Sequence, residues 1–342
     1  MHVPTNHLLA GPVFYLLICQ DFLSVSSFSS IPGSYLTIKS FRHGTDNHGT
    51  TLLAHDIILL DHLNINHEKG THNALCDFYF NTLGFRPDPR KSENLEKGGG
   101  TVWANAGATQ VHLSEGKPQP QVLDGFVTLK YPSSSSLKDL TSRAKENGVE
   151  VRYSEADPTH VTLFCPYGNK FVAEVGPRDP RGYQDEADEA LCNGISELTL
   201  HTKSSADLPG IARFYEVVFG LTPDLTSDKV SVPFGPHQRL TFVPGPVLNS
   251  NYEDGLGPHI SLYLHGLSNA WERASAHGLV YVNPRFKRKA STYEEAITQC
   301  MFRVLHIVDP DTDRKIMRLE HEIRSKYKND GLTLYKSFPF DS

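Results

Sequence analysis

The sequence predicts an α+β fold in which four similar units, each a strand, a helix and further strands, are arranged in two domains. The first observation is a strand of alternating polarity over residues 60–66, which leads into a helix ended by Gly84. Alternation places apolar side chains on one strand face and polar ones on the other, and glycine favours the left-handed conformation that stops a helix. The second observation is that Phe78-Tyr79 in this helix recurs as Phe214-Tyr215 in a later strand–helix unit.

Two further strand–helix units complete the set of four. An alternating strand at 125–130 precedes a helix that ends at Gly148. Its later copy is a strand at 257–264, followed by a helix that ends at Gly278. The polar face of each opening strand is free to line a cavity, because the helix covers the apolar face.

The order of these units along the chain predicts where the domains begin and end. A chain of 342 residues is long enough for two ordinary domains. We expect an N-terminal domain over residues 56–177 and a C-terminal domain over residues 194–322. A charged, turn-rich linker at 178–193 would join them, and a polar tail would occupy residues 323–342.

Residues 1–55 differ from the rest in composition and are expected to form a leader. The apolar run 8–19 is too short to span a bilayer, and 24–51 is rich in serine and threonine with few acidic residues. These features favour a leader for an organelle, either plastid or mitochondrion, or for secretion. The alternatives are a disordered tail or an unused upstream start codon, in which case the protein would be cytoplasmic.

The composition is that of a soluble globular protein. It is 39% hydrophobic and 21% charged, with a net charge of −6. The negative balance argues against a nucleic-acid partner, and no apolar run is long enough for a membrane span. The five cysteines show no paired spacing, so no disulfide framework is expected.

These motifs together resemble the vicinal oxygen chelate superfamily, the group of glyoxalases, bleomycin-resistance proteins and extradiol dioxygenases. The resemblance is carried by His62 in the first strand, the repeated aromatic pair and two closing turns, Pro166–Phe171 and Asp309-Pro310-Asp311. It implies two tandem glyoxalase-like domains, each of two βαβββ modules that form a cup-shaped mixed sheet with helices on the convex side. It also implies a small-molecule substrate or ligand, a monomer or homodimer, and metal ligands on the first and last strands of each module.

In the N-terminal domain the family's ligand positions hold His62, His112, Phe126 and, after a shift of two residues, Glu174. Two imidazoles and a carboxylate would suit non-haem iron or a related divalent ion, such as zinc, nickel or manganese. Phe126 cannot bind a metal and would contact the substrate, as would Asn64. The alternative is that the two histidines are separate cavity residues, hydrogen-bonded to neighbours such as Asn64.

In the C-terminal domain the same positions hold a mixed set of residues: Glu197, Thr241, His259 and, if a β-bulge shifts the last strand, Glu320. Glu197, His259 and Glu320 would be metal ligands, and Thr241 would contact the substrate. Tyr263 and His265 share the polar face with His259 and would act as acid–base groups, unless they only donate hydrogen bonds. The basic loop 286–291 would either be solvated or attract an anionic substrate.

Two classes of function remain open from the sequence. The first is a metal-dependent enzyme that acts on vicinal oxygens of a small substrate, as a glyoxalase-type lyase or in the manner of an extradiol dioxygenase. The second is a metal-free binding protein of the bleomycin-resistance type. Phe126, Thr241 and the apolar Val172, where the family usually has a carboxylate, favour the second class. The shared face of His62, His112 and Glu174 favours the first, which we take as the working hypothesis.

Overall fold

The computed structural model describes residues 44–45, 51–52, 57–116, 120–154, 157–179, 191–248 and 257–327. The predicted leader lies outside these ranges, apart from the short antiparallel pair β1 (Gly44–Thr45) and β2 (Thr51–Leu52). Most of the predicted linker and tail also lie outside them. Within the described ranges, no helix is both long and apolar enough to cross a membrane.

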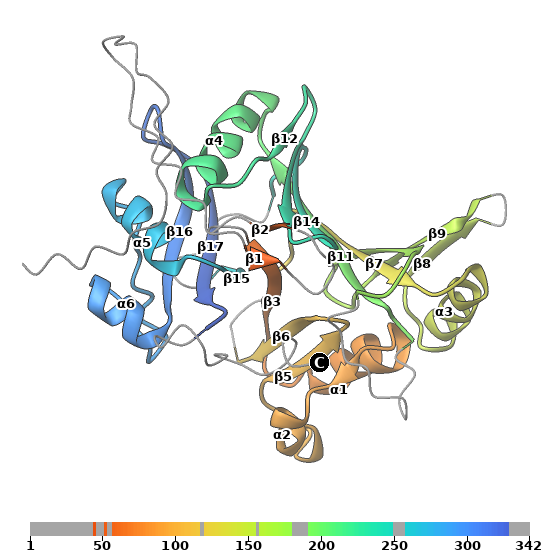
Figure 1. The fold of residues 1–342 in the computed structure, drawn as a ribbon. Coiled ribbons are helices and arrows are strands. Elements are labelled where there is room, and N and C mark those ends of the chain that lie inside the picture. Colours follow the sequence, from red (N-terminus) through yellow and green to blue (C-terminus); the bar gives the residue numbers. More distant parts are fainter. Residues whose placement is uncertain are drawn as a thin grey trace, which may run out of the picture. The chain divides into compact units, whose positions relative to one another are not determined.

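The first of two large sheets has seven strands in the order β16-β17-β15-β3-β6-β5-β4 (Figure 1). Its strands come from the first and fourth modules: β3 (Ile57–His67), β4 (Arg86–Pro87), β5 (Val102–Ala106), β6 (Thr109–Glu115), β15 (His259–Leu264), β16 (Met301–Asp309) and β17 (Arg314–Ser325). The two opening strands, β3 and β15, pair antiparallel at the centre. Each has the last strand of its own module beside it in parallel, β6 next to β3 and β17 next to β15.

The second sheet has eight strands in the order β12-β13-β14-β11-β7-β10-β9-β8. Its strands come from the second and third modules: β7 (Gly125–Tyr131), β8 (Val151–Ser154), β9 (Asp157–Phe164), β10 (Lys170–Val175), β11 (Gly194–Thr202), β12 (Asp224–Leu225), β13 (Val230–Phe234) and β14 (Gln238–Pro244). The plan is the same as in the first sheet. The opening strands β7 and β11 pair antiparallel, with β10 and β14 parallel to them on either side.

The α+β class and the four repeated modules are confirmed, but the modules pair differently from our expectation. We expected each sheet to form within one half of the chain, whereas each sheet combines one module from each half. The repeat shows which strands are equivalent. It does not show which edges pair, because all four opening strands offer the same alternating pattern. This pairing decides which polar residues can meet.

The helices follow the predicted repeat. Helix α1 (His72–Cys76) continues as the π-helical η1 (Asp77–Thr82), which carries Phe78-Tyr79, and α4 (Leu208–Phe219) carries Phe214-Tyr215. The two aromatic pairs have the same geometry, with ring centroids 5.1 Å apart and interplanar angles of 86° and 88°. All four rings are buried, so each pair anchors its helix to the core.

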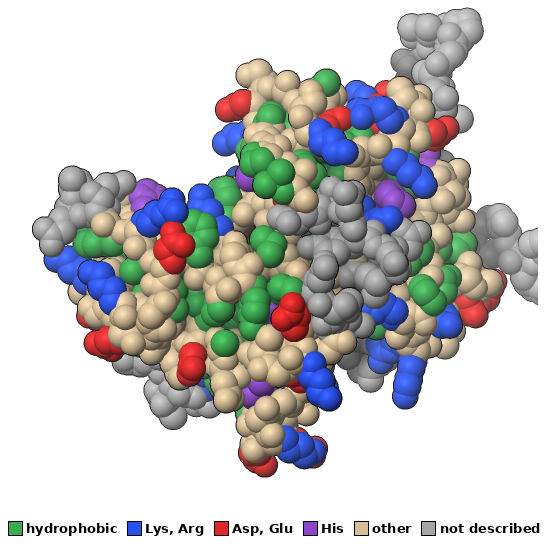
Figure 2. All heavy atoms as spheres, turned by 180° about the vertical axis from the view of Figure 1, so that it is seen from behind, with side chains coloured by type: hydrophobic (Ala, Val, Ile, Leu, Met, Phe, Trp, Pro, Cys, Tyr) green, Lys and Arg blue, Asp and Glu red, His purple; other side chains and the backbone are tan. Residues whose placement is uncertain are grey.

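The other helices pack on the sheets from outside the strand layers. Helix α3 (Ser134–Glu146) contacts β8, β9 and β10, while α5 (Leu267–Ala276) and α6 (Tyr293–Gln299) contact β16 (Figure 1). Helix α4 contacts both β13 and β16 and so bridges the two sheets. The short elements are η2 (Pro89–Lys91), α2 (Ser92–Glu96) and η3 (Ser205–Asp207). Acidic and basic side chains are interspersed on the face drawn in Figure 2.

Candidate metal centre

Two histidines from opposite halves of the chain face each other at the centre of the seven-stranded sheet. In the antiparallel β3–β15 pair, His62 lies opposite Ser261 and His259 lies opposite Asn64, so the two histidines are diagonal neighbours on one face. Their Nε2 atoms are 3.2 Å apart. Both side chains are buried, at 2% and 5% exposure.

A carboxylate from the adjacent strand completes a cluster of three. Glu322 on β17 lies beside Ser261, and its Oε2 is 3.8 Å from His259 Nε2. One ligand atom from each of His62, His259 and Glu322 lies within 4.8 Å of the other two. Among the described residues, this is the group of three found with metal-binding spacing.

His112 lies next to this cluster but does not join it. Its ring stacks on His62, with centroids 3.8 Å apart, and Trp103 stacks on its other face at 4.3 Å. The His112 Nε2 is 3.3 Å from Gln110 Oε1. By stacking on one face of the His62 ring, His112 thus restricts the orientation of that ring.

Two arginines hold the carboxylates of the site. Arg303 binds one Glu322 oxygen and Arg324 binds the other. Arg303 also binds Glu320 at 2.5 Å, and Arg324 binds Asp61 at 3.2 Å. These three carboxylates and two guanidiniums leave the group with one excess negative charge when all five are ionised.

Burial determines the protonation of the ionisable groups. It lowers the pKa of His62 and places those of His259 and His112 well below the usual range, so all three imidazoles are neutral near pH 7. Burial alone would raise the pKa of Glu322, but Arg324 and Arg303 outweigh it and hold that pKa well below its usual range. Neutral imidazoles and an ionised carboxylate are the forms that bind metals.

Asp61 sets the orientation of His62. Its Oδ2 is 2.8 Å from His62 Nδ1, so Nδ1–H donates to the carboxylate. The lone pair of His62 is then on Nε2, which faces His259. A carboxylate behind a histidine in this way fixes the ring and raises its basicity as a ligand.

The other predicted N-terminal ligand does not reach this site. Glu174 lies on β10 of the eight-stranded sheet, where it binds Lys130 and lies 3.3 Å from His160. Phe126 is on the neighbouring β7, under the Lys170 ammonium at 4.8 Å. The expected convergence of His62, His112 and Glu174 is therefore wrong, because the second module pairs with the third and not with the first.

Two residues expected in the C-terminal site also belong to the eight-stranded sheet. Glu197 on β11 accepts a hydrogen bond from Thr199 at 3.4 Å. Thr241 on β14 donates to Ser231 at 3.2 Å. The structure does not bring either of them to His259, for the same topological reason.

Three of the four remaining predicted residues lie at or near the cluster. Glu320 is buried and held by Arg303 and by Asn283, whose amide donates at 2.8 Å. Asn64 accepts from Ser114 at 3.0 Å, on the same face of β3 as His62. Tyr263 is buried beside Arg324, and burial raises the pKa of its hydroxyl. His265, the fourth, lies just beyond the end of β15.

Glu322 was not predicted from the sequence, although the alternation of charged residues on its strand could have indicated it. Glu320, Glu322 and Arg324 alternate on β17, so a strand that places one toward the cluster places all three there. The register between β16 and β17 shifts between Val304 and His306 and again between Ile307 and Val308, and β17 has an extra residue at each place. The prediction for Glu320 required an irregularity of this kind.

The basic loop of the fourth module begins at the cluster. The Phe286 ring is 5.6 Å from that of His259, and the Arg303 guanidinium lies over it at 4.0 Å. Asn283, just before it, binds Glu320. The loop is thus held against the site at its first residues.

Comparison with known proteins supports this fold. No family model matches the sequence, and a search of curated proteins finds no match. Among solved structures, a candidate dioxygenase from Bacillus subtilis is 14% identical, with a TM-score of 0.51, and the match covers 83% of this chain and 91% of that one. Glyoxalase I from Zea mays is 11% identical, with a TM-score of 0.49, over 80% and 92% of the two chains. With its four repeated modules, the chain therefore has a glyoxalase-like fold.

Proposed function

We propose that this protein is a metal-dependent enzyme in which His62, His259 and Glu322 hold a divalent ion. The observation that carries the proposal is the approach of three buried ligand atoms to within 4.8 Å of one another. Two imidazoles and one carboxylate are the protein ligands of many non-haem iron sites, which keep positions open for a substrate. Iron(II) or manganese(II) would suit this set.

The spacing fits such an ion. Metal–ligand bonds of about 2.1 Å place neighbouring ligand atoms roughly 3 to 3.5 Å apart. The His62–His259 separation of 3.2 Å is already in this range, and the His259–Glu322 separation of 3.8 Å is slightly above it. The His62 and Glu322 ligand atoms lie within 4.8 Å of each other, so the carboxylate would have to approach His62 by up to about 1.5 Å.

The charge fits as well. A divalent ion would change the group of three carboxylates and two guanidiniums from one excess negative to one excess positive charge. A substrate that binds as a monoanion would then neutralise the site. Since buried charge is costly unless it is balanced, the site favours an anionic substrate with two neighbouring oxygen atoms.

The residues around the ion have separate tasks in this proposal. The ion would act as a Lewis acid toward the two substrate oxygens. Asp61 orients His62, and Arg303 and Arg324 fix both oxygens of Glu322. Tyr263, protonated because burial raises its pKa, lies on the same strand as His259 and would donate a hydrogen bond to the substrate.

Metal analysis of matched variants tests the proposal. The purified protein should contain close to one equivalent of a divalent metal, and Glu322→Gln should lose most of it while remaining folded. Glu174→Gln is the matched control, because that carboxylate lies in the other sheet and should leave the metal content unchanged. Equal metal content in wild type and Glu322→Gln would contradict the assignment.

One observation favours a metal-free binding protein as the second candidate. Both oxygens of Glu322 already have arginine partners, so the carboxylate is compensated without an ion. In that case the protein would contain no bound metal after purification, and added iron or manganese would not raise its thermal stability.

A further inference from the structure

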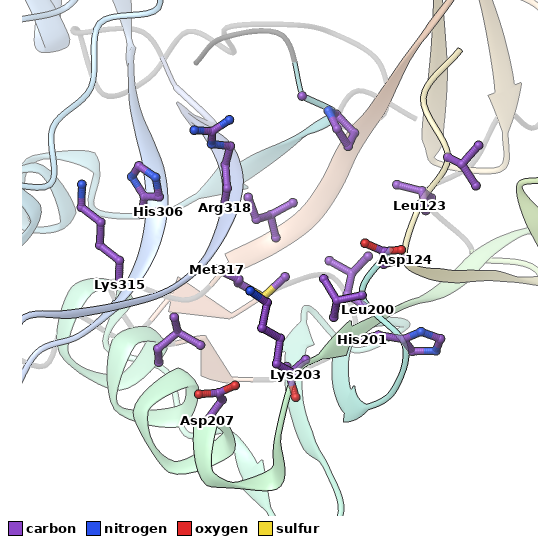
Figure 3. Close-up of a pocket in the computed structure, with 17 residues that line it drawn as sticks. Leu123, Asp124, Leu200, His201, Lys203, Asp207, His306, Lys315, Met317 and Arg318 are labelled. Carbon is purple, nitrogen blue, oxygen red and sulfur yellow. The ribbon is translucent and has the colours of Figure 1, made fainter. Parts of the chain in front are cut away.

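A second place in the molecule has the features of a ligand site. A cavity of about 350 Å³ lies where the end of β11 and the segment before β7 meet β16 and β17 (Figure 3). This volume is in the range of sites for small molecules. The cavity is lined by none of His62, His259 and Glu322, so it is separate from the proposed metal centre.

Part of the cavity wall is apolar. Leu123, Leu200 and Leu319 line it and are buried in the hydrophobic core, at 5% to 7% exposure. Met317 lines it as well and packs against the same core. A ligand with an apolar body could therefore bury that body against side chains that are already shielded from water.

The other part carries positive charge. Lys203 and Lys315 line the cavity, and within the described parts of the chain neither ammonium has an ion-pair partner. In Figure 3 the Lys203 side chain extends from the end of β11 in the direction of Met317. Long lysine side chains can lie along an apolar wall while their charged ends stay at its rim.

The carboxylates in the lining already have partners. Asp207 binds Arg314 at 2.8 Å, and Asp124 accepts a hydrogen bond from the Leu248 backbone N–H at 2.9 Å. They are therefore not held by the two lysines. The cavity combines an apolar wall with ammonium groups that no carboxylate of the described chain neutralises.

We propose that this cavity binds a small organic anion, namely a carboxylate on an apolar body. The apolar wall would accept the body, and Lys203 and Lys315 would attract the carboxylate. The proposal does not depend on the metal centre, and no metal takes part in it.

Methionine methyl NMR with octanoate tests this proposal directly. The chain has three methionines, at positions 1, 301 and 317, and of the two that the structure describes, Met301 and Met317, only Met317 lines the cavity. Octanoate should shift the Met317 methyl signal in a saturable way and leave that of the buried Met301 unchanged. Met317→Leu assigns the signal. 1-Octanol, which has the same apolar chain without the charge, should bind at least about fivefold more weakly.

Variants separate the charge effect from general binding. The double variant Lys203→Gln/Lys315→Gln should raise the Kd for octanoate at least about fivefold, since each lysine removed takes away an unneutralised charge. Lys138→Gln, on the exposed side of α3, is the matched control and should bind octanoate like wild type. Equal affinity for octanoate and octanol, or unchanged affinity in the double variant, would overturn the proposal.

The Glu322→Gln variant distinguishes this cavity from the metal centre. It should bind octanoate with wild-type affinity, whatever its metal content. If octanoate binding is lost together with the metal, the ligand occupies the His–Glu cluster and the proposal for the cavity is wrong.

Discussion

The two imidazoles of His62 and His259 show at the scale of single residues why the site suits a cation. Asp61 fixes the His62 tautomer with its Nε2 lone pair toward His259 Nε2, 3.2 Å away. If His259 Nε2 also presented a lone pair, the two lone pairs would repel each other at that distance. A proton or a metal ion must therefore lie between the two nitrogens. Because burial keeps both imidazoles neutral, a metal ion can compete with a single shared proton.

A histidine outside the site makes the fold sensitive to acid. His67 is fully buried, and burial lowers its pKa from 6.5 to about 4. The unfolded chain therefore binds a proton between pH 6.5 and 4 that the folded chain does not, and stability falls as the pH falls through this window. The expected loss between pH 7 and pH 5 is about 2 kcal/mol.

His67→Phe should remove this loss, because phenylalanine keeps the ring that contacts Tyr167 and cannot be protonated. Urea unfolding at pH 7 and pH 5 measures the effect. His277→Phe, at an exposed position after α5, should unfold with the same pH dependence as wild type. A wild-type pH dependence in His67→Phe would contradict the account.

At the scale of secondary structure, the alternation of each strand was predictable and its partner was not. The polar faces of β3 and β15 were assigned correctly, so His62 and His259 do face a common site. The position of Glu320 and Glu322 on this face depends on register shifts between β16 and β17, which the sequence permits but does not place. Arg303 was not predicted, since nothing local shows that it reaches two carboxylates on the next strand.

The close pairing of β7 with β11 in the eight-stranded sheet requires a glycine at position 125. Gly125 begins β7 with a φ of +149°, and a Cβ atom there would lie 2.0 Å from the backbone oxygen of Thr199 on β11. Gly125→Ala should therefore force β7 and β11 apart and lower the free energy of unfolding by roughly 2 to 4 kcal/mol. Chemical denaturation measures this change.

Gly148 offers a matched control. It also has a positive φ, +65°, but a Cβ atom there would meet nothing within 4 Å. Gly148→Ala should cost only the conformational strain, about 1 kcal/mol. If the two variants are equally stable, the close approach of β7 and β11 does not limit side-chain size at Gly125.

At the scale of the whole molecule, the site exists because the first and fourth modules share a sheet. His62 comes from the first module, and His259 and Glu322 come from the fourth. The repeat predicted four modules but not which modules share a sheet. His62 and His259 were therefore assigned to the correct strand faces but grouped with residues of the other sheet, such as Glu174 and Glu197. Long-range strand order is set by which edges bury best together, and this depends on the entire chain.

This pairing predicts that neither half of the chain folds alone. A fragment of residues 57–179 would have two modules from different sheets, each with its opening strand, β3 or β7, unpaired on one edge. We expect fragments 57–179 and 191–327 to show no cooperative thermal unfolding when separate. Co-expression should restore a complex that unfolds cooperatively. Cooperative unfolding of residues 57–179 alone would contradict the observed strand order.

The most direct test of the proposed metal centre is anomalous X-ray diffraction at the absorption edges of iron and manganese. Crystals of the protein purified with its metal should show one strong peak, about 2.0 to 2.2 Å from His62 Nε2, His259 Nε2 and a Glu322 oxygen. The same peak should be absent from crystals of Glu322→Gln. A peak at other residues, or no peak at this cluster in protein supplied with both metals, would contradict the account.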